Sequence, residues 1–201
     1  MDKQCKINAF RAGLTQFVTF EEDEWEILSQ HLSFLTLKKK DHFIVEGKVC
    51  DYIAFIVHGS ARHYHVKDGQ EITGYFYFEN ELVSAYKSFL KRVPSTNFIQ
   101  ALEKTELVLI AYTDLQKMLN HPILALKMER FGRLVAEHYI CCYEDRVTAF
   151  ITQSPEERYT MLEKTAKDIF QRVPQHFIAN FLGITPVSLS RIRKRTLILK
   201  D

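Results

Sequence analysis

The chain has 201 residues, 46% of them hydrophobic and 26% charged, so it can bury a core as an ordinary soluble protein does. The formal net charge is only +2, which excludes a polycation, so any nucleic-acid signal must come from where the basic residues lie. No run approaches the roughly 18 apolar residues of a membrane span, and the N-terminus lacks the apolar stretch of a secretory signal. We therefore expect a cytoplasmic protein with no membrane partner.

The first predicted element is an amphipathic helix over Glu24–Ser33. Trp25, Leu28 and Leu32 recur on one face at helical spacing. The acidic run Glu21–Glu24 suits a helix N-terminus, because the helix dipole favours negative charge there.

Residues 35–112 have a different character, with short runs rich in β-branched and aromatic residues between turn signals. Asp68-Gly69 between two such runs is the strongest hairpin signal. Many short strands at a regular interval predict an antiparallel barrel or jelly roll. The predicted strands are Leu35–Lys38, His42–Val45, Tyr52–Val57, Ala61–Val66, Ile72–Phe78, Asn97–Leu102 and Leu107–Tyr112.

A long helix follows, since the apolar period becomes helical from Asp114. Gly132 alone, and no proline, interrupts Ile123–Ile151. Such a helix exceeds the usual length of ~8–20 residues and indicates a coiled-coil contact with a second copy. The alternative is a helix buried against its own barrel. The side chains expected to face the second copy are Met128, Phe131, Val135, His138 and Cys142.

Helix boundaries are clearest in the C-terminal part. Ser154-Pro155 predicts an N-cap and a first-turn proline for a helix that continues through Lys167. Gln175–Leu182 is a short amphipathic helix, and Gly183 follows it where the chain needs a positive φ. Thr185 then caps a second helix.

This second helix, Pro186–Arg195, buries Val187 or Leu189 together with Ile192 and exposes small polar and basic side chains. Helix, glycine turn and basic helix together are the layout of a helix-turn-helix, in which Arg191 can read guanine through two hydrogen bonds. A helical hairpin with a solvated basic tail is the alternative. The predicted DNA contacts are Thr185, Val187, Ser188, Ser190, Arg191, Arg193, Lys194 and Arg195.

The order of these parts resembles the Crp/Fnr family of bacterial regulators. The motifs that carry the resemblance are Phe43–Gly47, Asp51–Gly59, Asp68–Glu71, Ile178–Gly183 and Ser188–Arg193. The aromatic-rich style and short tail are similar to Bacteroidetes-type members.

The resemblance implies an α+β chain with three parts. These are an antiparallel jelly-roll barrel like a cyclic-nucleotide-binding domain at residues 1–113, a dimerisation helix at 114–152, and a winged-helix-like helix-turn-helix with a reduced wing at 153–201. It implies a transcription regulator that binds double-stranded DNA as a homodimer. RNA polymerase is a further candidate partner, and an unknown small-molecule effector is a candidate ligand.

The sequence departs from the family at the site for cyclic nucleotide. The family's phosphate-binding arginine falls on Ser95, its ribose-binding glutamate falls near Ala85, and Arg92 is three residues out of place. A buried phosphate without an arginine is poorly compensated, so we expect no cyclic nucleotide and an unknown ligand. A filled barrel without any ligand is the alternative. The candidate pocket residues are Tyr75, Tyr77, Ser84, Tyr86, Lys87, Ser95, Thr96 and Asn97.

No nucleophile elbow, P-loop or dinucleotide fingerprint occurs, and we expect no enzyme activity. The spacing of the four cysteines suits no zinc site and no iron–sulfur cluster. His63 and His65 alternate on one strand face and could bind a metal or haem, but no third ligand is evident, so we expect an exposed polar strand face and no metal site. The competing interpretation is a ligand-binding or protein-interaction module without sequence-specific DNA binding.

Overall fold

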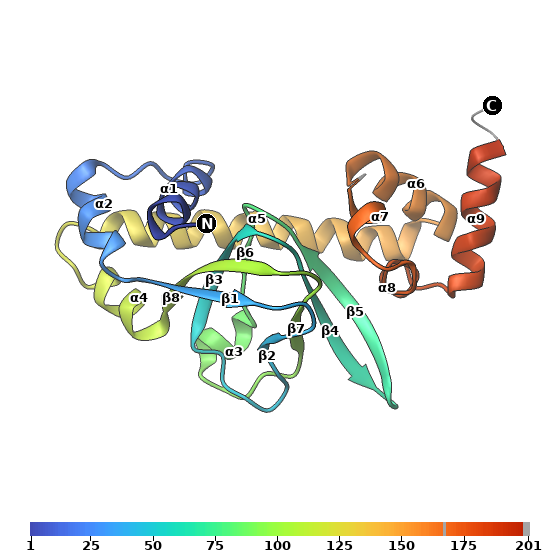
Figure 1. Ribbon diagram of the computed structural model, residues 1–201, viewed down its shortest axis with the longest axis horizontal. Coiled ribbons are helices and arrows are strands. Elements are labelled where there is room, and N and C mark those ends of the chain that lie inside the picture. Colours follow the sequence, from blue (N-terminus) through green and yellow to red (C-terminus); the bar gives the residue numbers. More distant parts are fainter. Residues whose placement is uncertain (167, 199–201) are drawn as a thin grey trace. The chain divides into compact units, whose positions relative to one another are not determined.

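The computed structural model describes residues 1–166 and 168–198, and the chain forms two compact units, Met1–Glu137 and His138–Asp201 (Figure 1). The boundary falls inside the long helix α5, Ala125–Thr152. Among the described residues, no helix combines the length and the apolar character needed to cross a membrane.

The first unit contains two four-stranded antiparallel sheets, with strand orders β1-β8-β3-β6 and β2-β7-β4-β5. This arrangement confirms the predicted antiparallel barrel. The two-residue strand β6 was not predicted, because so short a pairing leaves no periodic signal. The strands are β1 Leu32–Leu37, β2 His42–Ile44, β3 Tyr52–His58, β4 Ala61–Lys67, β5 Gln70–Tyr77, β6 Leu82–Val83, β7 Phe98–Ala101 and β8 Thr105–Ala111.

The predicted hairpin turn joins β4 to β5. Asp68 and Gly69 both have positive φ, +53° and +75°, as a two-residue turn of the tight hairpin type requires. The turn sets the register in which Lys67 pairs with Gln70.

The barrel interior is filled by small and branched side chains from both sheets. Ala54 and Ile56 of β3, Ile99 of β7 and Leu107 of β8 are almost completely buried. Phe89 of the short helix α3, Tyr86–Lys91, closes the same core. Each of the larger side chains, Ile56, Phe89, Ile99 and Leu107, contributes roughly 1.5–3 kcal/mol of burial free energy.

A second apolar cluster covers the outer face of the first sheet. Helices α1 (Lys3–Leu14), α2 (Glu22–Ser29) and α4 (Tyr112–Leu119) supply it together with the first turns of α5. Phe10 packs edge-on against Phe55 at 5.2 Å between ring centroids. A Cβ at Gly13 would lie 2.3 Å from the same Phe55 ring, so this close helix–sheet contact requires glycine. Helix α1 was not predicted.

Two of the expected dimer contacts belong to this cluster, which corrects the sequence interpretation. Met128 is 2% exposed and Phe131 is 9% exposed, and Phe131 packs edge-on against Phe17 at 5.8 Å. Val135 is half-buried against the same cluster. The alternative interpretation, a helix buried against its own domain, holds for this end of α5. His138 is exposed and Cys142 is half-buried.

The second unit is helical. Its helices, besides the end of α5, are α6 Pro155–Thr165, α7 Ile169–Arg172, α8 Gln175–Phe181 and α9 Pro186–Ile198. The predicted cap of α6 is present, because the Glu157 N–H donates to Ser154 Oγ at 3.3 Å and the Ser154 N–H donates to Glu157 Oε2 at 2.8 Å. The helix ends at Thr165, and Lys167, its predicted end, lies outside the described residues.

Glu81, just before β6, is half-buried, and its surroundings raise its pKa strongly. Burial raises its pKa to about 7, the hydrogen bond from the Phe78 N–H opposes the rise, and the charge of Glu79 adds to it. The folded state therefore holds the proton in a pH range where the unfolded chain has already released it.

We predict that stability depends on pH through Glu81. Between its ordinary pKa of 4.5 and its folded pKa of about 7, ionisation favours the unfolded state, so the free energy of unfolding falls as the pH rises. Glu81→Gln removes this fall. The free energy of unfolding of the variant, relative to that of the wild type, should therefore rise by about 1–3 kcal/mol from about pH 5 to about pH 8. Urea denaturation at both pH values measures it. Glu129→Gln, at an exposed position of α5, is the control. A difference in the free energy of unfolding between Glu81→Gln and the wild type that is the same at both pH values would contradict the prediction.

Candidate functional site

The turn between α8 and α9 has the geometry that its sequence predicted. Gly183 has φ +71°, and the Ile184 N–H donates back to the Ala179 carbonyl at 3.0 Å. A Cβ at position 183 would also lie 3.0 Å from the Phe150 ring, so both conformation and space favour glycine.

Thr185 caps α9 as predicted. Its Oγ1 accepts the Ser188 N–H at 3.1 Å, and Pro186 fills the first helical position, where no N–H is needed. The Thr185 and Ser188 hydroxyls also lie 2.9 Å apart and share a hydrogen bond. These two hydroxyls therefore hold the start of the helix in place.

Helix α8 braces α9 through a small apolar contact. Ile178 of α8 and Leu182, the residue that ends it, are buried, as are Leu189 and Ile192 of α9. Val187 is 60% exposed, so of the two residues considered for the buried position, Leu189 occupies it. The core contact fixes which face of α9 points outward.

That outward face is basic. Arg191 and Lys194 are exposed, and Arg193 is half-buried. Arg195 is exposed but forms an ion pair with Glu156 at the start of α6, so its charge is partly neutralised. Ser190 and Val187 are exposed on the same helix. A hollow of about 620 Å³ lies beside this helix, against Pro155 and Glu156.

In the barrel, the residues compared above with the family's nucleotide-binding cassette lie at α3 and in the loop after it. Ala85 immediately precedes α3 and is buried in the barrel core. Ser95 is buried too, and its Oγ donates to the Asn97 carbonyl at 2.9 Å. Arg92 has φ +54°, and its guanidinium pairs with Asp51. The same guanidinium donates to the Cys50 carbonyl at 2.8 Å and stacks on the Tyr112 ring at 4.4 Å.

The eight residues expected to line a pocket fall into separate groups. Tyr75 and Tyr77 lie side by side, 4.9 Å between ring centroids, and Tyr77 is part of the barrel core. Ser84 Oγ donates to the Tyr52 carbonyl at 3.0 Å. The exposed residues are Tyr86, Lys87 and Thr96, while Ser95 and Asn97 hydrogen-bond to each other.

In the described part of the chain, no three His, Cys, Asp or Glu side chains gather closely enough to hold a metal ion. His63 and His65 lie 5.0 Å apart between ring centroids on β4, and His65 Nδ1 lies 2.9 Å from the Thr96 carbonyl.

Comparison with known proteins defines the class of fold. Residues 34–121 match the cyclic nucleotide-binding domain. The chain is 14% identical to the c-di-GMP-responsive global regulator CLP of Xanthomonas campestris, with a TM-score of 0.67 over 86% of this chain and 90% of that one. It is 15% identical to the catabolite activator protein of Thermus thermophilus, with a TM-score of 0.56 over 94% and 88%. FixK2 of Bradyrhizobium japonicum is 18% identical, with a TM-score of 0.64 over 84% and 86%.

No curated protein matches the sequence. At these low identities the similarity to solved structures shows the fold. Residues 34–121 thus have the fold of a cyclic nucleotide-binding domain, and the chain as a whole has a fold similar to that of these three regulators.

A cyclic nucleotide does not fit the cassette residues. The methyl group of Ala85 offers no acceptor to a ribose hydroxyl, and the Ser95 hydroxyl is held by Asn97. Arg92 is paired with Asp51, so an incoming phosphate would have to displace that carboxylate and turn the side chain away from Tyr112. The fold of the domain is therefore present, but Ala85 and Ser95 occupy the positions at which a glutamate and an arginine would bind the nucleotide.

We therefore predict that cyclic AMP and cyclic GMP, at about 1 mM, leave the melting temperature unchanged, because a ligand stabilises only the state it binds. Differential scanning fluorimetry measures this. Wild type and Arg92→Gln are compared, since Arg92 is the remaining arginine of the cassette loop. A clear rise for the wild type that Arg92→Gln abolishes would show that Arg92 leaves Asp51 for the phosphate and would refute the prediction.

Proposed function

We propose that the chain is a transcription regulator that binds double-stranded DNA sequence-specifically, with α9 as the helix that enters the major groove. The single observation that carries this is the outward face of α9. It is basic and small-sided, and α8 braces it from behind through Ile178 and Leu189. The regulators with the same fold support the proposal.

The contacts follow from the chemistry of each side chain. Arg191 is exposed and presents the fork of donors that matches guanine O6 and N7. Val187 offers an exposed apolar group in the first turn, where a thymine methyl is the matching surface. Lys194 and Arg193 meet phosphates, and Ser190 contacts a phosphate or a base edge. Arg195 contributes less than expected while it remains paired with Glu156.

We further propose a homodimer joined along the C-terminal half of α5. Four of the apolar side chains exposed there recur every three or four residues, which is the spacing of one helix face: Ile140, Tyr143, Val147 and Ile151. Ile140 is 65% exposed and Val147 is 57% exposed within the single chain. This stripe takes the place of Met128 and Phe131 as the proposed contact. His138 and Cys142 lie on the same half of the helix and stay among the proposed contacts.

In this function the barrel serves as a sensor or as a scaffold for a ligand other than cyclic nucleotide, and RNA polymerase is a proposed further partner. A regulatory rather than an enzymatic role, and a Bacteroidetes-type origin, are part of the same proposal. A binding module without DNA contact is the second candidate, and DNA binding decides between them.

The first test uses a duplex selected from a random pool by the purified protein, with a scrambled duplex beside it. Arg191→Ala should weaken binding to the selected duplex by about 10- to 100-fold, or 1–3 kcal/mol, and should affect the scrambled duplex little. Lys194→Ala should weaken both equally and reduce the slope of log affinity against log salt by about 0.9. Fluorescence anisotropy at several salt concentrations measures both.

Arg133→Ala is the control, because Arg133 lies on α5 in the first unit and pairs with Glu137 at 2.5 Å. It should leave both affinities unchanged. If Arg191→Ala lowers the affinity for both duplexes equally, Arg191 contacts phosphates and not a base. Absence of any duplex binding at low salt would favour the module without DNA contact.

The dimer is tested by placing a charge in the exposed stripe. Ile140→Asp and Val147→Asp should convert the dimer to a monomer in analytical ultracentrifugation, because two carboxylates would be buried at the contact. They should also lower affinity for a two-half-site duplex by more than about tenfold, since two linked reading heads bind together. Met161→Asp, on the exposed side of α6, is the control and should stay dimeric. A wild-type protein that sediments as a monomer would rule out this contact.

A further inference from the structure

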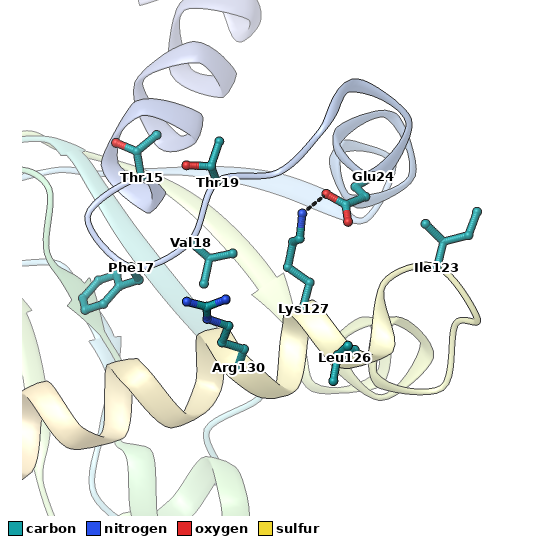
Figure 2. A pocket seen from close by; sticks show the side chains of 9 residues that line it. All are labelled: Thr15, Phe17, Val18, Thr19, Glu24, Ile123, Leu126, Lys127 and Arg130. Atoms are coloured by element: carbon teal, nitrogen blue, oxygen red, sulfur yellow. Dashed lines mark hydrogen bonds and ion pairs between the residues drawn. The ribbon is translucent and has the colours of Figure 1, made fainter.

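A cavity outside the barrel lies at the N-terminal end of α5. It has a volume of about 480 Å³ and is bounded by the segment that follows α1, by α2 and by the first two turns of α5 (Figure 2). Every residue that lines it belongs to the first unit. The volume is within the range of roughly 300–1,000 Å³ that small-molecule sites occupy. It is distinct from the cassette at α3.

The walls of the cavity are largely apolar. Val18 and Phe17 form one side, and Ile123 and Leu126 form the other. Leu126 is 85% exposed, although it stands at the edge of a well-packed core. A hydrocarbon or aromatic group placed against the buried Val18 would remove the exposed Ile123 and Leu126 from water, which is favourable by roughly 25 cal/mol per Å² of apolar surface.

Two cations, Lys127 and Arg130, reach into this space from positions three residues apart on α5. Lys127 forms an ion pair with Glu24 of α2, so its charge is balanced. Figure 2 shows Arg130 beside it, directed toward the segment that holds Val18. Within the described residues, Arg130 has no ion pair and no hydrogen bond. The cavity therefore carries a net charge of one positive unit, from a guanidinium.

These features together select a class of ligand. A guanidinium binds a carboxylate through two parallel hydrogen bonds. One uncompensated positive charge balances one carboxylate, whereas a phosphate dianion would remain partly unpaired against Glu24. The apolar walls require a hydrocarbon or aryl body attached to that carboxylate.

We propose that this cavity is a binding site for a small organic monocarboxylate, with the carboxylate on Arg130 and the apolar body between Val18 and Leu126. The hydroxyl of Thr15 already donates to the Ala12 carbonyl at 2.6 Å, and it offers its lone pair to a further donor on the ligand. A ligand bound there would be an effector that acts at the N-terminal end of α5. Its existence does not depend on DNA binding.

The test uses the full chain with methyl-labelled isoleucine, leucine and valine, and two probes, octanoate and 3-phenylpropionate. Each acid is titrated beside its own amide, which has the same shape without the charge. We expect saturable methyl shifts at Val18, Ile123 and Leu126, with each acid binding about tenfold more tightly than its amide.

Two matched variants separate the site from general surface binding. Arg130→Gln should reduce the preference for acid over amide to less than about twofold, because the charge that selects the acid is gone. Arg133→Gln removes another exposed arginine of α5, one that pairs with Glu137, and should keep the preference. The methyl spectrum itself reports whether each variant is folded.

Three results of the titrations would overturn the proposal, and a complete absence of binding would be a fourth. These are equal affinity for acid and amide in the wild type, an acid preference that survives in Arg130→Gln, and shifts centred on barrel residues in place of Val18 and Leu126. If neither acid causes a saturable shift at about 10 mM, the protein does not bind these acids at this cavity with a millimolar dissociation constant, and the proposal is wrong. None of these results bears on whether α9 binds DNA.

Discussion

The packing of Met128 and Phe131 into the first unit is the contact on which the arrangement of this chain depends. Burying two such side chains stabilises the fold by roughly 1.5–3 kcal/mol each, and it fixes the N-terminal end of α5 against α1 and α2. The helix is 28 residues long in all, and in its C-terminal half Ile140, Tyr143, Val147 and Ile151 are exposed. One half of α5 is therefore satisfied within the chain, while Ile140 and Val147 still expose apolar surface that a second copy would cover.

The difference between the two halves explains which predictions from sequence succeeded. Local chemistry was predictable: Asp68-Gly69 makes its turn, Ser154 caps α6, and Gly183 takes a positive φ, because each depends only on neighbours in the chain. The partner of an apolar stripe was not predictable, because a helical period shows that a face is buried without showing what covers it. Met128 and Phe131 were assigned to a dimer for that reason. Helix α1 was not predicted because only four of its 12 residues, among them Phe10, are buried, so its apolar pattern is weak.

The candidate site divides in the same way. The turn, the cap and the basic face of α9 could be read from a dozen consecutive residues, and the structure places them as the sequence suggested, with Leu189 rather than Val187 in the core. Ion pairs between distant residues could not be read. Two ion pairs join residues about forty positions apart in the sequence, Arg195 with Glu156 and Arg92 with Asp51, and no periodicity or spacing predicts such pairs. Each pairing changes a functional assignment, because a paired arginine is less free to bind a phosphate.

The proposed regulatory role requires a site of control other than the cassette, because Ala85 and Ser95 cannot bind a ribose hydroxyl and a phosphate as a glutamate and an arginine would. A ligand shifts a conformational equilibrium only by the difference between its affinities for the two states, so an effective site must include an element whose position matters to the output. Helix α5 is such an element, since it contributes residues to both units. The cavity at its root is bounded by α2 on the opposite side, and the Lys127–Glu24 pair is the polar link between them. A carboxylate on Arg130 would add a second charged link across the same boundary, and it would favour whichever arrangement of α2 and α5 closes around it.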